Sequence, residues 1–122
     1  MKYLLIIFIC LISHGNIAQE CDVAITETHK FVGKEVVVCG EVTQVASPRG
    51  IQGNPTYLNM GGRYPNQTFT VVIWGQEAMQ FPMGFLKSLE GERIAVSGVI
   101  VDYRGKPQIV VGDVGEVVLK ED

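Results

Sequence analysis

The side chains best suited to chemistry in this sequence are aromatic rings and cations in its middle and near its C-terminal end. An exposed aromatic ring can stack on a nucleobase, and a lysine or arginine can neutralise a phosphate. Both kinds occur in or beside segments that glycine and proline mark as loops. The candidate binding residues are Arg49, Tyr57, Arg63, Tyr64, Trp74, Arg104 and Lys106.

Residues suited to catalysis or metal binding are sparse. Beyond residue 18 the sequence keeps one histidine, His29, so no Ser-His-Asp or Cys-His arrangement is expected unless Cys39 is a free nucleophile. The pairs Asp102/Asp113 and Glu90/Glu92 are typical of solvated carboxylates at strand ends. Two cysteines and one histidine without paired spacing make a poor zinc site. We therefore expect no enzymatic activity, no cofactor and no bound metal.

The N-terminus has the pattern of a secretory signal peptide over residues 1–18. Lys2 precedes an unbroken apolar run, Leu4 to Ile12, and small and polar residues follow it. The alternative, a membrane anchor, is disfavoured because this run is much shorter than the roughly 20 residues that span a bilayer. Cleavage after Gly15 and cleavage after Ala18 both remain open. The pattern predicts a secreted or periplasmic protein without stable membrane insertion, whose single domain covers residues 19–122.

Two cysteines remain in the predicted mature chain, Cys21 and Cys39. In an exported protein an even pair favours a disulfide, which would tie the N-terminal segment to the first long strand. The alternative is that Cys39 is a free thiol buried in an apolar strand.

The charge balance argues against a strongly electrostatic ligand. Without Lys2, nine basic residues face thirteen acidic ones, which gives a net charge of −4. A strong nucleic-acid binder normally presents a basic face. A local basic patch on an acidic protein remains compatible with this balance.

Alternation of apolar and polar residues predicts an all-β domain with one or two short helices. Helices are expected at 26–31, where Thr26 can cap the first turn, and at 76–81, before Pro82. Gly40 is expected to allow a bend in the long first strand. This order indicates a five-stranded Greek-key OB barrel, with a small open β-sandwich as the alternative. The strands are expected at 34–46, 57–60, 68–74, 92–103, 107–111 and 116–119.

Two sequence blocks resemble small bacterial OB-fold domains of the tRNA-anticodon-binding type. They run from Tyr64 to Trp74 and from Tyr103 to Ile109, and the valine–glycine strands that begin at Gly33 and Gly91 accompany them. The resemblance covers nearly all of residues 26–119 and implies a nucleic-acid-binding class.

Two functions follow from these observations. The first is an exported OB module that binds single-stranded DNA or RNA weakly, by aromatic stacking and by the cations of its loops. The second is an envelope adaptor that binds a protein or a small cationic ligand. Some candidates have structural alternatives: Trp74 could cover the barrel end, and the loop cations could be ordinary solvated charges. Phe69, which alternates with Val71 and Ile73, is expected in the core.

Overall fold

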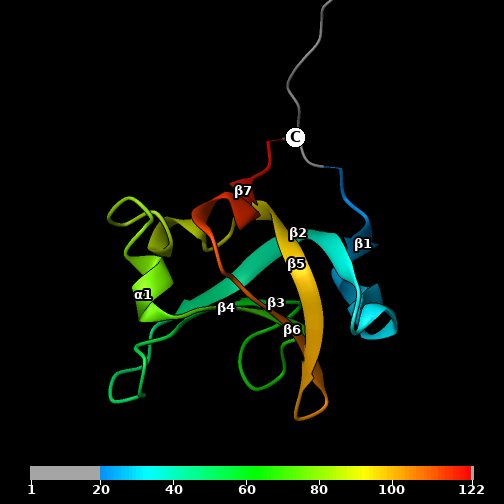
Figure 1. Ribbon diagram of the computed structural model, residues 1–122, viewed down its shortest axis with the longest axis horizontal. Helices are drawn as coiled ribbons and strands as arrows, with labels where there is room; N and C mark the ends of the chain where they lie inside the picture. Colours follow the sequence, from blue (N-terminus) through cyan, green and yellow to red (C-terminus); the bar gives the residue numbers. More distant parts are fainter. Residues whose placement is uncertain (1–19, 122) are drawn as a thin grey trace, which may run out of the picture.

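The computed structural model describes residues 20–121, so the predicted signal segment lies outside the described residues. Its strands form one sheet in the order β1-β2-β3-β4-β6-β5-β7, and the sheet closes because β2 also pairs with β5 (Figure 1). The closed ring consists of β2, β3, β4, β6 and β5, while β1 and β7 extend it outside the ring. The strands are β1 (Val23–Ala24), β2 (Glu35–Ala46), β3 (Thr56–Met60), β4 (Phe69–Ile73), β5 (Arg93–Tyr103), β6 (Lys106–Val110) and β7 (Val117–Leu119).

The barrel closes because β2 is long enough to pair with two neighbours. Its first half, from Glu35 to Glu41, pairs antiparallel with β5, and its second half pairs antiparallel with β3. Within the ring β4 and β6 run parallel and the other pairs are antiparallel. A closed ring of this kind confirms the predicted barrel and excludes the open sandwich.

The bend expected at Gly40 lies elsewhere in β2. Gly40 pairs regularly with Ile94, and the register shift falls between Val42 and Gln44. Gly40 has a different role, because a Cβ at this position would lie 2.8 Å from Ile25 and 3.0 Å from Met60. Its missing side chain lets the N-terminal segment pack directly on the barrel.

The barrel interior is filled by one face of each strand. Phe69 is fully buried, as its alternation predicted, together with Leu58, Met60, Val71 and Ile73. The rings of Phe81 and Phe85 stack with centroids 5.8 Å apart beside this core. Every second residue of β3 and β4 therefore points away from the core onto an outer face, where Tyr57 is half-buried and Asn59, Thr70 and Val72 are buried.

The helical segments differ from expectation in type and in length. The first is the 3₁₀-helix η1 (Ile25–Phe31), which starts after Ala24 without a side-chain cap, so Thr26 does not cap it. The second, α1 (Gly75–Ala78), ends early because the amides of Gln80 and Phe81 bond three residues back rather than four. Two further 3₁₀ turns are η2 (Lys87–Leu89) and η3 (Val114–Glu116).

The predicted disulfide joins Cys21 to Cys39, whose Cα atoms lie 5.6 Å apart. It fixes β1 alongside β2, where Ala24 is the register partner of Cys39. Cys39 is therefore buried but is not a free thiol. No helix among residues 20–121 has the length and hydropathy needed to cross a membrane.

Candidate functional site

The outer face of the barrel can be followed row by row from the strand register. One row crosses four of the ring strands with mainly apolar side chains: Ala46, Tyr57, Val72 and Val110. The next row is mainly polar: Gln44, Asn59, Thr70, Gln108 and Val101. Val99, Val101 and Val110 are 39–46% exposed, so the β5–β6 side of this face is open to solvent.

The polar row is a continuous hydrogen-bonded ladder over β2, β3 and β4. The Asn59 amide donates to Gln44 Oε1 (3.0 Å), the Thr70 hydroxyl donates to Asn59 Oδ1 (3.0 Å), and Gln67 Nε2 donates to Thr70 Oγ1 (3.1 Å). Gln67 Oε1 is buried and has no hydrogen-bond partner. Because Asn59, Thr70 and Gln67 are all buried, the ladder positions the loop above it more than it offers groups to a ligand.

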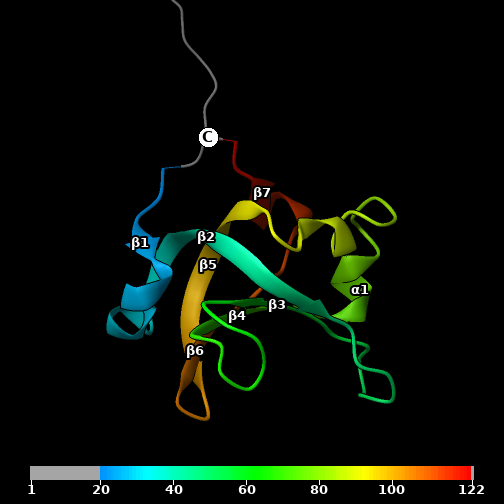
Figure 2. The same cartoon turned by 180° about the vertical axis from the view of Figure 1, so that it is seen from behind.

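The β3–β4 loop, residues 61–68, is held against this face from both sides. On the β2 side, the Tyr64 amide donates to Gln44 Oε1 and the Thr43 hydroxyl contacts Gly62 O at 2.6 Å. On the β6 side, Lys106 Nζ donates to Pro65 O at 2.9 Å and to Gln67 O at 2.8 Å. Figure 2 shows this loop beside the hairpin that joins β5 and β6. The loop therefore presents Arg63 and Tyr64 in a fixed position.

The hairpin between β5 and β6 carries a second aromatic–cation unit next to that loop. Arg104 and Gly105 form its tip with positive φ angles of 53° and 87°. The Arg104 guanidinium lies over the Tyr103 ring, 5.3 Å from its centroid. Tyr103 is 55% exposed and Tyr64 is 72% exposed. Tyr103 is not among the binding residues predicted from the sequence, although the alternation of its strand places it on the outer face.

The β2–β3 loop, residues 47–55, lies at the other end of the face. It is attached to the start of α1, because the Gly75 amide donates to Gly53 O at 2.8 Å. Trp74 packs against this loop and is 39% exposed. The loop that carries Arg49 therefore lies beside Trp74 and the start of α1. The β3–β4 loop, which carries Arg63, and the β5–β6 hairpin, which carries Arg104 and Lys106, lie away from α1 (Figure 1).

Two candidates differ from the rest in how they can act. Tyr57 is half-buried within the apolar row, so its ring offers only part of its surface. Lys106 donates two hydrogen bonds to backbone carbonyls of the β3–β4 loop, so it acts as a clamp that holds this loop in place.

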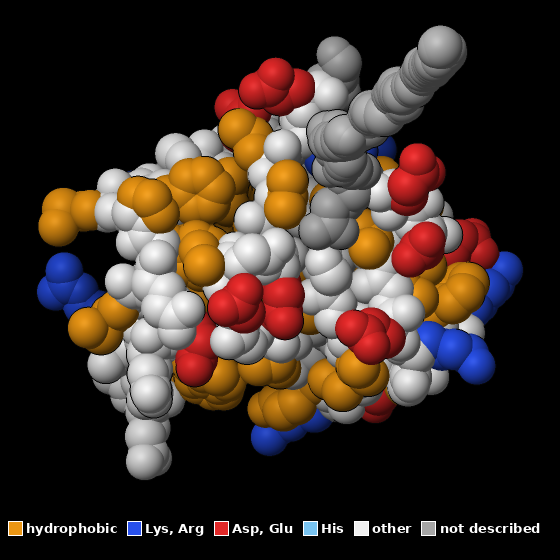
Figure 3. All heavy atoms as spheres, turned by 45° about the horizontal axis from the view of Figure 1, so that its top comes forward, with side chains coloured by type: hydrophobic (Ala, Val, Ile, Leu, Met, Phe, Trp, Pro, Cys, Tyr) orange, Lys and Arg blue, Asp and Glu red, His pale blue; other side chains and the backbone are white. Residues whose placement is uncertain are grey.

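Acidic residues are absent from the part of this face that is built by the second half of β2, by β3 and by β4. Residues 42–76 contain Arg49 and Arg63 but no aspartate or glutamate, and all thirteen acidic residues of the chain lie outside this stretch. This signal is visible in the sequence alone. Figure 3 shows acidic side chains spread over the side that carries β7, with lysines and arginines mostly near its margins. The acidic net charge thus resides away from the outer face of β3 and β4.

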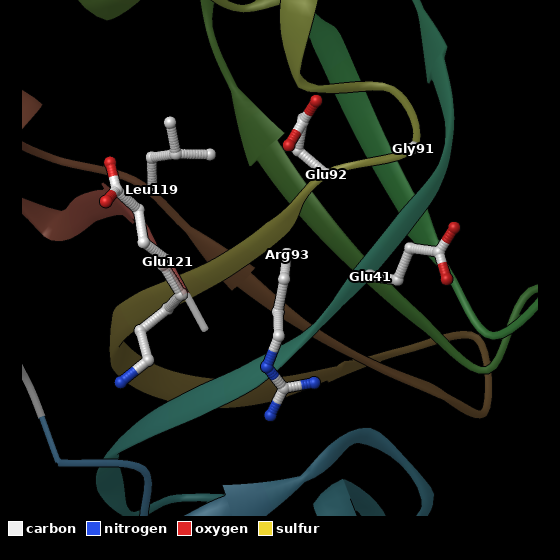
Figure 4. A pocket seen from close by; sticks show the side chains of 7 residues that line it. Glu41, Gly91, Glu92, Arg93, Leu119 and Glu121 are labelled. Carbon is white, nitrogen blue, oxygen red and sulfur yellow. The ribbon is translucent and has the colours of Figure 1, made fainter.

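A cleft of about 530 Å³ lies on that acidic side, between β2, β5 and β7. Its charged lining includes Glu41, Glu92, Glu121 and Arg93, and the three carboxylates point in different directions (Figure 4). Among residues 20–121 no three His, Cys, Asp or Glu side chains are placed to hold a metal ion. Away from both sites, an ion pair with Lys30 lowers the pKa of Glu27 on η1.

The strand order, the parallel β4–β6 pair and the helical segment between β4 and β5 define an OB-fold barrel. The sequence matches no protein-family model and no curated protein. Solved structures with the same fold include OBody AM1L10 bound to hen egg-white lysozyme (TM-score 0.56, 16% identity, covering 88% of this chain and 100% of that one).

Two further neighbours are parts of larger proteins. An aspartyl-tRNA synthetase from Leishmania major matches with a TM-score of 0.54 and 8% identity, over 90% of this chain and 22% of that one. RecG bound to a three-way DNA junction matches with a TM-score of 0.55 and 16% identity, over 80% of this chain and 12% of that one. At these identities the likeness concerns the fold.

Proposed function

We propose that this chain is an exported, non-enzymatic OB module that binds single-stranded nucleic acid weakly. The observation that carries the proposal is one end of the outer face. Residues 42–76 of this acidic protein contain no carboxylate, and the β3–β4 loop and the β5–β6 hairpin together present two exposed tyrosines and two arginines. Bases stack on exposed rings for about 1–3 kcal/mol each, and arginines attract the phosphates between them. The disulfide agrees with export to an oxidising compartment.

The expected affinity is low because the whole molecule repels a polyanion. A net charge of −4 opposes long-range attraction, so binding depends on a few local contacts. Such contacts release counterions, and the affinity should fall as salt increases. Two of the structural neighbours, the tRNA synthetase and RecG, support a nucleic-acid ligand by analogy of fold.

Fluorescence anisotropy with a labelled single strand at low salt tests this proposal. We expect measurable binding that Arg63→Glu and Tyr64→Ala each weaken. Arg93→Glu is the matched control, because it makes the same charge change on an exposed residue that lines the cleft of the acidic side. Equal losses for Arg63→Glu and Arg93→Glu would mean that only net charge matters, and no binding at low salt would end the proposal.

A second candidate, a protein-binding adaptor, is favoured by one specific observation. Val99 and Val101 on β5 and Val110 on β6 are all exposed, and exposed apolar side chains on one face are typical of a protein-binding surface. The engineered OBodies bound to lysozyme support protein binding by this fold. If single strands fail to bind, this patch becomes the surface to test.

A further inference from the structure

We infer that a second cleft, at the Trp74 end of the outer face, is a subsite for one unstacked nucleobase and prefers guanine. The inference rests on the proposed function and adds the base class that this end would select. The cleft has a volume of about 670 Å³ and lies between the β2–β3 loop and α1. It is lined by Gly53, Asn54, Trp74, Gly75, Gln76, Glu77 and Met79.

Two glycines make one wall of this cleft and fix its shape. A Cβ at Gly53 would lie 2.9 Å from the Trp74 ring, so the backbone of Gly53 covers part of the indole. A Cβ at Gly75 would lie 3.0 Å from Gly53 O, whose hydrogen bond with the Gly75 amide joins the loop to α1. The wall is therefore preformed, which reduces the entropy lost when a ligand enters.

The apolar groups of the cleft suit a flat ring. Trp74 is 39% exposed, and because Gly53 covers one side, the exposed part belongs to the remaining surface of the indole. Met79 is 84% exposed at the rim, where its flexible thioether can cover the edge of a bound ring. A planar heterocycle stacked on the indole would use both groups.

The polar groups of the cleft exclude a phosphate and select among bases. Glu77 is the one charged residue in the lining, and its carboxylate repels anions and only accepts hydrogen bonds. Guanine presents two adjacent N–H donors, at N1 and at its 2-amino group, and so can pair with a carboxylate at both oxygens. The other bases place an acceptor next to their donor, which faces the carboxylate unfavourably. Asn54 and Gln76 add amides that can donate to the O6 and N7 acceptors of guanine.

The cleft is also placed to continue the outer face. Thr70 and Val72 point outward from β4, and Trp74 follows them at the next outward position. The loop that contributes Gly53 and Asn54 to the cleft also carries one cation, Arg49. Thr70 and Val72 are buried, so Trp74 is the first of these outward side chains that is open to solvent, and a bound strand that reaches this end of the face could insert one base here while its backbone stays outside.

Intrinsic fluorescence tests this inference directly, because Trp74 is the only tryptophan of the chain. The probes are GMP, AMP, CMP and UMP, titrated into the processed protein with correction for their absorbance. We expect GMP to quench Trp74 with a dissociation constant of about 1 mM and to bind about fivefold or more tightly than the other three. Glu77→Gln should remove that preference, while Glu92→Gln, a matched change in the other cleft, should keep it.

The outcomes separate this inference from the proposed function. Equal quenching by all four nucleotides, or a guanine preference that survives Glu77→Gln, would overturn the guanine subsite. Oligonucleotide binding without any quenching of Trp74 would also overturn it and leave the proposed function standing. If GMP quenches Trp74 but the protein binds no oligonucleotide, the guanine subsite is supported and the proposal that the outer face binds single strands is refuted.

Discussion

Replacing Lys106 by methionine removes the ammonium group and keeps most of the aliphatic side chain. Lys106 Nζ holds the β3–β4 loop through Pro65 O and Gln67 O, so the substitution releases one side of that loop. The other side stays attached through Gln44, which accepts from the Tyr64 amide. Tyr64 then loses its fixed position without being altered itself.

The size of the effect follows from these two bonds. A hydrogen bond to a charged donor contributes about 1.5–3 kcal/mol when it is buried. Lys106 is half-buried, and solvent screening reduces the total for both bonds to about 1–2 kcal/mol. If nucleic-acid binding requires the ordered loop, the affinity should fall by about 5- to 30-fold.

Salt dependence distinguishes this clamp from a direct phosphate contact. Anisotropy titrations between about 50 and 200 mM salt give the slope of log K against log salt, and each phosphate contact to a single strand contributes about 0.7 to it. We expect Lys106→Met to weaken binding with an unchanged slope. Arg63→Met, the matched control on the same loop, should flatten the slope by about 0.7.

Hydrogen exchange measured without nucleic acid adds an independent readout. The Asn66 amide donates to Arg63 O at 2.6 Å within the loop, and its protection should drop in Lys106→Met. If Lys106→Met flattens the salt slope and leaves the exchange protection of the Asn66 amide unchanged, the clamp is refuted. Lys106 would then bind a phosphate directly.

Three other predictions concern stability and processing. Reducing the Cys21–Cys39 bridge, which spans 18 residues, should lower the free energy of unfolding by about 3 kcal/mol, and equal urea midpoints with and without reductant would contradict this. Phe69→Ala should cost about 3–5 kcal/mol because it empties a fully buried site, and a thermal melt close to that of the unaltered protein would show that the core closes around the cavity. Mass spectrometry of the protein from its producing cell should find an N-terminus between Asn16 and Glu20, and an intact Met1 in the mature pool would contradict export.

Strand positions and the barrel could be predicted because they depend on local chemistry. Alternation of valine and isoleucine marks the inward faces, and Phe69 falls among them. The pairing of β2 with both β3 and β5 follows from its length of 12 residues. Helix ends were less predictable, since Ala24 starts η1 without a cap and packing on the barrel fixes the segment.

The sequence by itself determined three features of this protein: an alternating all-β domain, an even number of cysteines in the predicted mature chain, and a carboxylate-free stretch from 42 to 76. The tertiary structure alone decided which of its polar side chains remain available to a ligand. Lys106 lies 41 residues from Pro65 in sequence and becomes its hydrogen-bond partner only when β6 lies parallel to β4. Gly53 and Trp74 form one wall of a cleft only when their loop joins α1. Such pairings depend on strand order and on contacts far apart in the chain, which local residue patterns do not encode.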